Sequence, residues 1–203
     1  MMDVSKINSL VELYFKKAEQ IDKKKPFLKW LNPKNNHEYN WEEVTEKIYK
    51  FSYKIKSLIK EGDRVLLLSE NRPEWLIADL GIMNAGGITV PIFTTYAERD
   101  YEYILKDCSP SLIVVSNDTQ FEKINKFIDN KKIISFEKIK TSSITFEGIF
   151  NEKYEKEIND KLNRKLPACI IYTSGTSGNP KGVILSHGGI LSNCEGALDL
   201  LQP

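Results

Sequence analysis

The chain has 203 residues, of which 41% are hydrophobic and 28% charged, and its net charge is +1. These values are typical of a folded globular protein and exclude a disordered one, and they give no argument for binding to nucleic acid or to an anionic membrane. No run of about 18 apolar residues predicts a membrane span, and the N-terminus has no secretory-signal pattern. Cys108, Cys169 and Cys194 are widely spaced in apolar contexts, so we predict reduced thiols and a cytoplasmic protein.

The first part of the chain, residues 1–62, predicts a helix, a β-hairpin and a second helix. Apolar residues recur at helical spacing over 9–21. Two short strands, 27–31 and 38–41, flank a turn-rich segment that predicts the hairpin. A long apolar stripe then predicts an amphipathic helix over about 42–60.

The next part, residues 63–136, alternates short apolar runs with helical patterns. Pro73 and Glu74 stand where a helix favours proline and negative charge, at its first turn. Continuous apolar strands that alternate with helices predict an α/β fold, with a largely parallel sheet of βαβ units flanked by helices. The predicted strands are 65–68, 88–93, 112–116 and 132–136, and the predicted helices are 73–84, 98–106 and 120–128.

The remaining residues divide into a charged segment and an apolar one. Residues 137–166 carry dense charge, which predicts a solvent-facing connector with one helix near 151–162. Residues 167–203 predict a hairpin of two strands around a phosphate loop, followed by the start of a helix. We expect that helix to begin near Ser186 or His187.

The loop of this hairpin is the one part of the sequence that indicates a chemistry. The stretch from Ile171 to Val183 reads IYTSGTSGNPKGV and is rich in hydroxyl residues and glycine, with one lysine. Such a loop presents backbone N–H groups, hydroxyl donors and one ammonium group in a small volume. These are the groups that bind a polyphosphate.

Two familiar motifs fail to match this loop. In a Walker P-loop that starts at Gly175 the second glycine would stand at Pro180, and Ser or Thr would stand at Gly182. The following residues also predict a strand, where a Walker loop opens directly into a helix. A hydrolase elbow, G-x-S-x-G, would need a closing glycine at Asn179, so we do not expect Ser177 to be a nucleophile.

The loop instead resembles the signature of the adenylate-forming, or AMP-binding, superfamily. Thr173–Gly182 is similar to T-S-G-T-[ST]-G-x-P-K-G at every defined position. Upstream, GDRV at Gly62–Val65, ENRPEW at Glu70–Trp75 and AGGITVP at Ala85–Pro91 look like the N-terminal lobe of acyl-CoA synthetases, closest to the long-chain fatty acid branch. The resemblance covers roughly residues 40–203 and implies the N-terminal subdomain of such an enzyme.

The resemblance implies a two-step ligase reaction. A carboxylic acid, here a long-chain fatty acid, attacks ATP to give an acyl-adenylate, and the acyl group then passes to coenzyme A. Both steps develop negative charge, which cations and hydrogen-bond donors stabilise. By the resemblance, Lys181 is catalytic and Thr173 also helps to hold Mg²⁺, while the residues expected to bind the ATP phosphates are Thr173, Ser174, Gly175, Thr176, Ser177, Gly178 and Lys181.

Several alternatives stay open at this stage. Family members are much longer, so we expect a truncated, N-terminal fragment that is inactive alone. Another carboxylate (aryl or amino acid) and a truncated ATP-binding or regulatory module are the alternatives. Residues 1–60 offer a surface for a homodimer, and peripheral contact with a membrane stays open. We expect Asn71 and Arg72 to cap a helix rather than to belong to the site.

Overall fold

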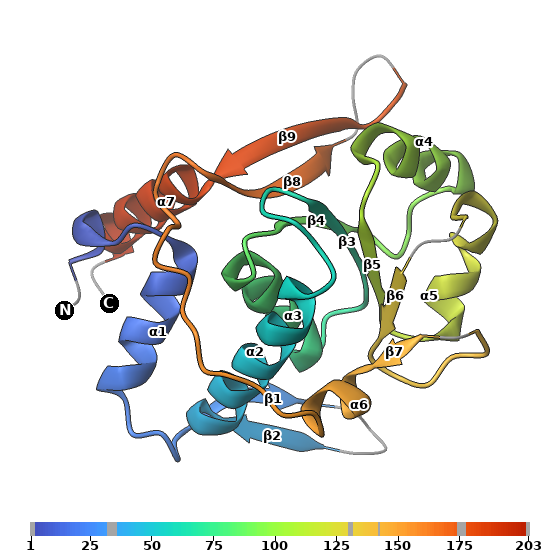
Figure 1. Cartoon of the computed structure of the whole chain (residues 1–203). Helices are drawn as coiled ribbons and strands as arrows, with labels where there is room; N and C mark the ends of the chain where they lie inside the picture. The colour runs from blue at the N-terminus through green and yellow to red at the C-terminus, as the bar shows by residue number, and fades with distance from the viewer. Residues whose placement is uncertain (1–2, 32–35, 130–131, 142, 174–177, 202–203) are drawn as a thin grey trace.

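The computed structural model describes residues 3–31, 36–129, 132–141, 143–173 and 178–201. In this part of the chain a seven-stranded sheet is flanked by helices, and a separate two-stranded hairpin lies near the N-terminus (Figure 1). The hairpin and sheet strands are β1 (Pro26–Trp30), β2 (His37–Asn40), β3 (Arg64–Leu68), β4 (Ile88–Ile92), β5 (Leu112–Val115), β6 (Lys132–Ser135), β7 (Ile144–Thr145), β8 (Pro167–Thr173) and β9 (Lys181–Ser186). The α-helices are α1 (Leu10–Gln20), α2 (Trp41–Lys56), α3 (Pro73–Asn84), α4 (Glu98–Cys108), α5 (Asp118–Glu122), α6 (Phe146–Phe150) and α7 (His187–Leu201), with 3₁₀ turns η1 (Val4–Lys6) and η2 (Asn125–Phe127).

The main sheet confirms the predicted α/β fold class. Its strand order is β7-β6-β5-β3-β4-β8-β9, and all neighbouring strands are parallel except β8 and β9. The chain places β4 on one side of β3 and then returns to place β5 on the other side. The direction in which strands are added therefore reverses at β3. In open α/β sheets such a switch point places a crevice at the carboxyl ends of the strands.

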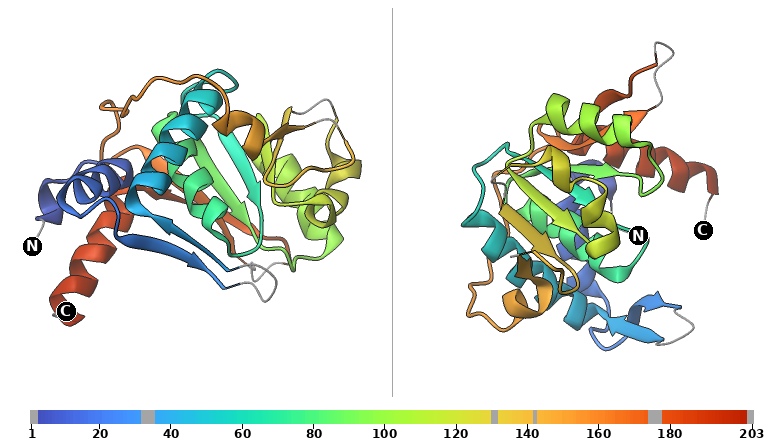
Figure 2. Two further views of the ribbon diagram at one scale, coloured as in Figure 1. Left: turned by 90° about the horizontal axis from the view of Figure 1, so that it is seen from below. Right: turned by 90° about the vertical axis from the view of Figure 1, so that its right-hand side faces the viewer.

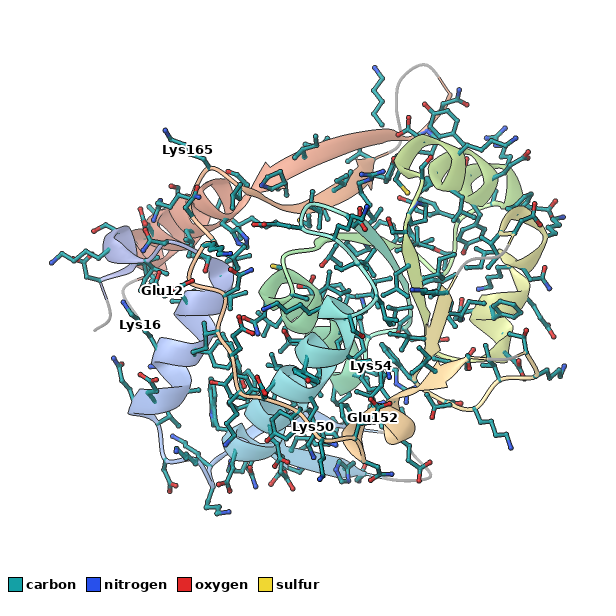
Figure 3. The ribbon with its side chains drawn as sticks, viewed as in Figure 1. Glu12, Lys16, Lys50, Lys54, Glu152 and Lys165 are labelled. Atoms are coloured by element: carbon teal, nitrogen blue, oxygen red, sulfur yellow. The ribbon has the colours of Figure 1, made fainter. Side chains whose placement is uncertain are left out.

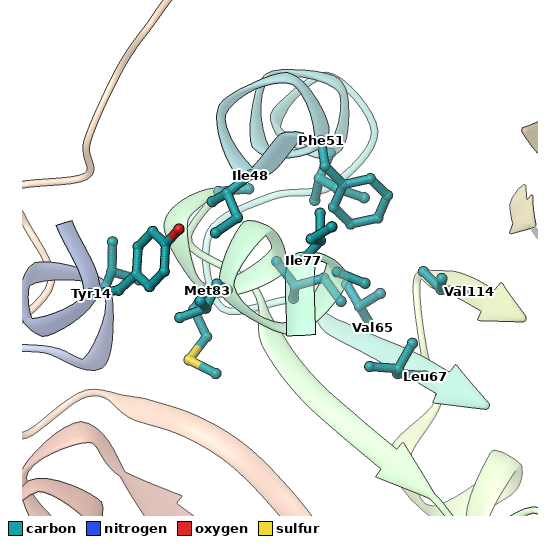
Figure 4. Close-up of a cluster of buried hydrophobic side chains, with 14 of the residues drawn as sticks. Tyr14, Ile48, Phe51, Val65, Leu67, Ile77, Met83 and Val114 are labelled. Carbon is teal, nitrogen blue, oxygen red and sulfur yellow. The ribbon is translucent and has the colours of Figure 1, made fainter. Parts of the chain in front are cut away.

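Helices cover both faces of the sheet, because β3 and β5 bury side chains on both faces. Val65, Leu67 and Val114 face α2 and α3 within the larger core cluster (Figure 4). Leu66 and Ile113 face the opposite way, towards α4. Figure 2 shows the two layers of helices with the sheet between them. Strands buried on both faces read as continuous apolar runs, which is why the sequence predicts them well.

The N-terminal segment packs against the larger core, and its first residues lie close to the C-terminal helix. The side chain of Asn40 accepts a hydrogen bond from the backbone of Glu43, whose side chain in turn accepts from the backbone of Asn40. This capping box begins α2 at the end of the hairpin. Val4 and Ile7 pack on Leu191 of α7, so the two ends of the described chain lie side by side (Figure 1).

Three predicted elements differ from the structure. The helix predicted over 42–60 ends at Lys56. The helix predicted over 120–128 is two short pieces, α5 and η2, because Lys123 N–H and Ile124 N–H donate to the third residue before them and tighten the turn. The helix predicted near 151–162 is wrong, since no helix is present there in the described chain.

The segment 151–166 is instead an extended strap across α2 and α3. Lys54 pairs with Glu152 at 2.8 Å, and Figure 3 shows both side chains on this face. The strap is anchored from below by the buried side chain of Asn84, which donates to the carbonyl of Glu157 (2.9 Å) and accepts from the N–H of Asn159 (2.9 Å). High charge density predicts a solvent-facing segment correctly here, but it does not specify a helix.

Candidate functional site

The β8–β9 hairpin presents the predicted phosphate loop. β8 is anchored in the sheet beside β4, and its residues Ala168, Cys169 and Tyr172 are buried. β9 returns antiparallel, with Thr173 and Lys181 as direct partners across the pair. The structure therefore brings the first and last predicted phosphate-binding residues together at the base of one loop.

The remaining predicted residues divide between the described and the undescribed chain. Ser174, Gly175, Thr176 and Ser177 lie outside the described residues. Gly178 is exposed and has φ +92°, a left-handed conformation that favours glycine. The side chains of Thr173 and Lys181 are also exposed, so their hydroxyl and ammonium groups are accessible to a ligand. An exposed donor pair beside a glycine at positive φ fits an anionic ligand.

Close packing at Gly182 determines how near β8 and β9 lie to each other next to the loop. A Cβ atom at Gly182 would lie 3.0 Å from Ile170 Cγ2 and 3.1 Å from the Tyr172 ring. Those distances are shorter than ordinary carbon contacts, so glycine here lets β9 lie directly over the ring.

Tyr172 fixes the start of the loop. Its hydroxyl donates to the carboxylate of Asp107 on α4, and its carbonyl accepts a 2.8 Å hydrogen bond from the Tyr96 hydroxyl. Burial, followed by the bond to Asp107, raises the pKa of Tyr172, so the phenol stays protonated and remains a donor. The residue before Thr173 is thus held through both its side chain and its backbone.

A cleft of about 500 Å³ lies beside the hairpin, at the carboxyl ends of β3, β4 and β8. This is the place that the strand order predicts for a ligand. The walls are mostly apolar or aromatic, and Glu70 contributes a carboxylate. The lining residues are Ser69, Glu70, Asn71, Trp75, Pro91, Ile92, Phe93, Thr94, Thr95, Ile171 and Tyr172.

Glu70 is a fixed anion on the wall of this cleft. Its carboxylate accepts hydrogen bonds from Ser116 Oγ (2.6 Å), Gln120 Nε2 (2.6 Å) and Asn117 Nδ2 (3.4 Å). Burial acts to raise the pKa of Glu70, but these hydrogen bonds outweigh it, and the pKa lies below its usual value. Glu70 is therefore charged at neutral pH.

Sequence reasoning missed the cleft and the tyrosines that flank it. Asn71, which we expected only to cap a helix, lines the cleft. Arg72 stands at the N-cap of α3 but makes no capping hydrogen bond; its guanidinium pairs with Glu74 (2.9 Å) and Glu137 (2.7 Å). A usable signal was present, because polar residues that directly follow buried parallel strands meet at one edge of the sheet.

Neither a metal-binding cluster nor a membrane-spanning helix is found in the described residues. The described chain contains no group of three or more His, Cys, Asp and Glu side chains that could hold a metal. Thr173 supplies a single hydroxyl, a weak ligand for a hard cation by itself. No helix in the described ranges combines the length and the apolar character that crossing a membrane requires.

The hairpin, the glycine at positive φ and the cleft at the switch point together form a candidate ligand site on an α/β domain. Residues 15–202 match the family described as AMP-binding enzyme. The chain belongs to that family.

Comparisons with individual proteins agree with this assignment. The chain is 34% identical over 148 residues to the long-chain-fatty-acid–CoA ligase ACSBG2 of Gallus gallus, and 32% identical over 150 residues to ACSBG1 of Homo sapiens. These alignments cover 66% and 67% of this chain but 19% and 21% of the relatives, so the chain spans about a fifth of their length.

Solved structures of several enzymes share the fold. A luciferase-like enzyme from the mealworm Zophobas morio superposes with a TM-score of 0.83 at 20% identity, over 98% of this chain and 47% of that one. The anthranilate CoA ligase AuaEII gives a TM-score of 0.78 at 23% identity, over 92% and 37%. At these identities the likeness shows the fold alone.

Proposed function

We propose that this chain is the phosphate-binding part of an ATP-dependent ligase that activates a long-chain fatty acid as its adenylate and passes it to coenzyme A. The observation that carries the proposal is the pairing of Thr173 with Lys181 at the base of a glycine- and hydroxyl-rich loop, in a chain of the AMP-binding enzyme family. The fatty acid is taken from the names of the curated relatives.

In this proposal Lys181 neutralises charge on the phosphates of ATP. The attack of a carboxylate on the α-phosphorus transfers negative charge to pyrophosphate, and a nearby ammonium stabilises that charge more in the transition state than before it. Thr173 and the loop residues Ser174–Gly178 add hydroxyl and backbone donors. Thr173 would also offer its hydroxyl to Mg²⁺, which supplies charge neutralisation when bound with ATP.

The cleft beside the loop would receive an uncharged part of a substrate. Trp75, Pro91 and Phe93 give it apolar walls, whereas the Glu70 carboxylate repels a second anion. The anionic and uncharged portions of the reactants are thereby directed to neighbouring but different surfaces.

A binding measurement tests the role of the loop. Removing a charge-assisted contact weakens binding by about tenfold or more, so Lys181→Ala should weaken ATP binding by that factor in calorimetric titration of the full chain with MgCl₂ present. Lys165→Ala is the matched control, because Lys165 is exposed and lies at the opposite end of the hairpin from the loop (Figure 3). Equal ATP affinity in both variants would rule out the proposed role.

One alternative function is a truncated ATP-binding or regulatory module, which holds ATP without turnover. Acyl-CoA formation by the 203-residue chain alone would contradict this module. Activity that returns only when the remainder of the fold is added would support a split enzyme. A panel of fatty, aryl and amino acids would decide the carboxylate, since structural neighbours include an anthranilate ligase.

We also propose the division of the chain into four parts, its cellular location and its oligomeric state as the sequence predicts them. The four parts are 1–62, 63–136, 137–166 and 167–203. We propose that the protein is cytoplasmic and makes peripheral contact with a membrane. We also propose that it forms a homodimer through residues 1–60. Size-exclusion mass with and without residues 1–60 tests the dimer, and vesicle co-sedimentation tests the membrane contact.

A further inference from the structure

Two sets of hydrogen bonds, joined by the backbone between Thr94 and Tyr96, connect the carboxylate of Glu70 to the start of the phosphate loop. Gln120 Nε2 donates to Glu70 at 2.6 Å, and Gln120 Oε1 accepts from Lys123 Nζ at 2.8 Å. Lys123 Nζ also donates to the carbonyl of Thr94 at 2.6 Å. Two residues further, the Tyr96 hydroxyl donates to the carbonyl of Tyr172 at 2.8 Å.

The groups in this line are placed to act on one segment, residues 93–96. That segment leaves the carboxyl end of β4, has no regular secondary structure, and forms one wall of the cleft. It is held from one side by Lys123 and from the other by the hydroxyl of Tyr101, which donates to the carbonyl of Phe93 at 3.0 Å. An irregular segment whose carbonyl groups accept two such hydrogen bonds has its backbone fixed by side chains rather than by a sheet ladder.

Lys123 is committed to this structural contact. Its ammonium donates to a neutral carbonyl and a neutral amide, and it forms no ion pair with a carboxylate of the described residues. Its neighbour Lys126, by contrast, forms an exposed ion pair with Glu98. Gln120 is buried, so its amide has a defined orientation between Glu70 and Lys123.

We propose that Gln120, Lys123 and Tyr96 are positioning residues that set the start of the phosphate loop by holding segment 93–96 against Tyr172. The inference rests on the proposed function, because it assigns a purpose to the geometry of Thr173. In this proposal the three residues do not bind the phosphates themselves; they act through the backbone of Tyr172, one residue before Thr173. The same line of contacts couples the cleft wall to the loop.

The test measures ATP affinity and stability separately in the full chain. Tyr96→Phe removes only the hydroxyl bond to Tyr172, and Lys123→Met removes the ammonium while keeping the length of the side chain. We expect each to weaken ATP binding by about fivefold, because the start of the loop is then held less firmly. The matched controls, Tyr53→Phe and Lys126→Met, change exposed side chains of the same types and should leave ATP affinity within twofold.

A double-mutant cycle separates positioning from general destabilisation. If Tyr96 and Lys123 act through one segment, the double variant should bind ATP about as weakly as either single variant, because their effects are not additive. A merely structural role would lower the unfolding midpoint and leave the affinity of the folded fraction unchanged, and that result would overturn the proposal.

Lys181→Ala, measured in the same titrations, keeps the two proposals distinguishable. If Lys181→Ala weakens ATP binding while Tyr96→Phe and Lys123→Met do not, the positioning role is wrong and the proposed function stands. If Lys181→Ala also has no effect, both are wrong.

Discussion

His187 shows how one residue can be assigned to the right element and still carry an unforeseen role. It begins α7 as predicted, but it is buried, and its Nδ1 accepts a hydrogen bond from the N–H of Leu10 at 3.3 Å. This bond requires the proton on Nε2 in the neutral ring. His187 thereby ties the first helix of the chain to the last.

The burial of His187 makes the stability of the protein depend on pH. Burial lowers the pKa of His187 from its ordinary 6.5 to about 4. Between these values the unfolded chain binds a proton that the folded chain does not, so stability falls as the pH drops from about 7 towards 4. The loss amounts to roughly 2 to 3 kcal/mol.

The expected outcome is a flatter pH profile in His187→Asn, whose side-chain oxygen can keep accepting from Leu10 but does not titrate. Urea unfolding at several pH values between 4 and 7 measures the slope. His37→Asn is the control, because His37 is exposed and is the only other histidine in the sequence. An unchanged slope in His187→Asn would contradict the assignment.

At the scale of elements, the junction of β9 and α7 depends on a close backbone contact. The N–H of Gly188 donates to the carbonyl of Arg164 at 2.8 Å. A Cβ atom at Gly188 would lie 2.7 Å from that carbonyl oxygen and 2.9 Å from Arg164 Cβ. The first distance involves backbone, so the contact cannot be relieved by rotating a side chain.

Gly188→Ala should therefore destabilise the protein by about 1 to 3 kcal/mol, as overpacking does. Gly196→Ala, on the same helix, is the matched comparison: nothing lies within 4 Å of its Cβ position, and it should stabilise by up to about 1 kcal/mol. Chemical denaturation of both variants shows whether each substitution raises or lowers the free energy of unfolding. Equal effects at the two glycines would mean that helix propensity alone decides.

The strap at 151–166 is held on the helices by polar contacts of two kinds, exposed ion pairs and buried hydrogen bonds. Its exposed ion pair, Lys56–Glu157, joins two side chains that are more than half exposed, and such pairs contribute about 0 to 1 kcal/mol. Asn84 is 4% exposed and makes three hydrogen bonds, to Ser52 and to two backbone groups of the strap. The buried amide therefore holds the strap more firmly than the surface charges do.

Asn84→Ala should lower stability by about 2 kcal/mol, since it leaves buried groups without partners. It should also speed tryptic cleavage in the strap, at Lys153, Lys156 or Lys161. Lys56→Ala should change stability by less than about 0.5 kcal/mol. Limited proteolysis followed by mass spectrometry compares the cleavage rates of the two variants. Faster cleavage in Lys56→Ala than in Asn84→Ala would contradict the stronger role of Asn84.

At the scale of the whole molecule, the sequence predicts the strands of the main sheet better than it predicts the site. Doubly buried strands such as β3 and β5 are visible as unbroken apolar runs, and the loop from Thr173 to Lys181 is visible as a motif. The cleft is not, because it depends on strand order. Glu70 and Tyr172 are about a hundred residues apart in sequence and line the same cleft only because β4 lies between β3 and β8.

That strand order has a consequence for how the molecule folds. Thr89 of β4 pairs with Cys169 of β8, eighty residues later, whereas β4 pairs with β3 across a much shorter connection. Closing the longer loop costs about 4 kcal/mol of chain entropy, only about 1 kcal/mol more than the shorter one, so equilibrium stability changes little. Folding speed is more sensitive to such distant contacts. On a ribosome β3 to β6 leave the exit tunnel before β8 does, and the hairpin that carries Thr173 and Lys181 joins a sheet whose other strands are already available to pair.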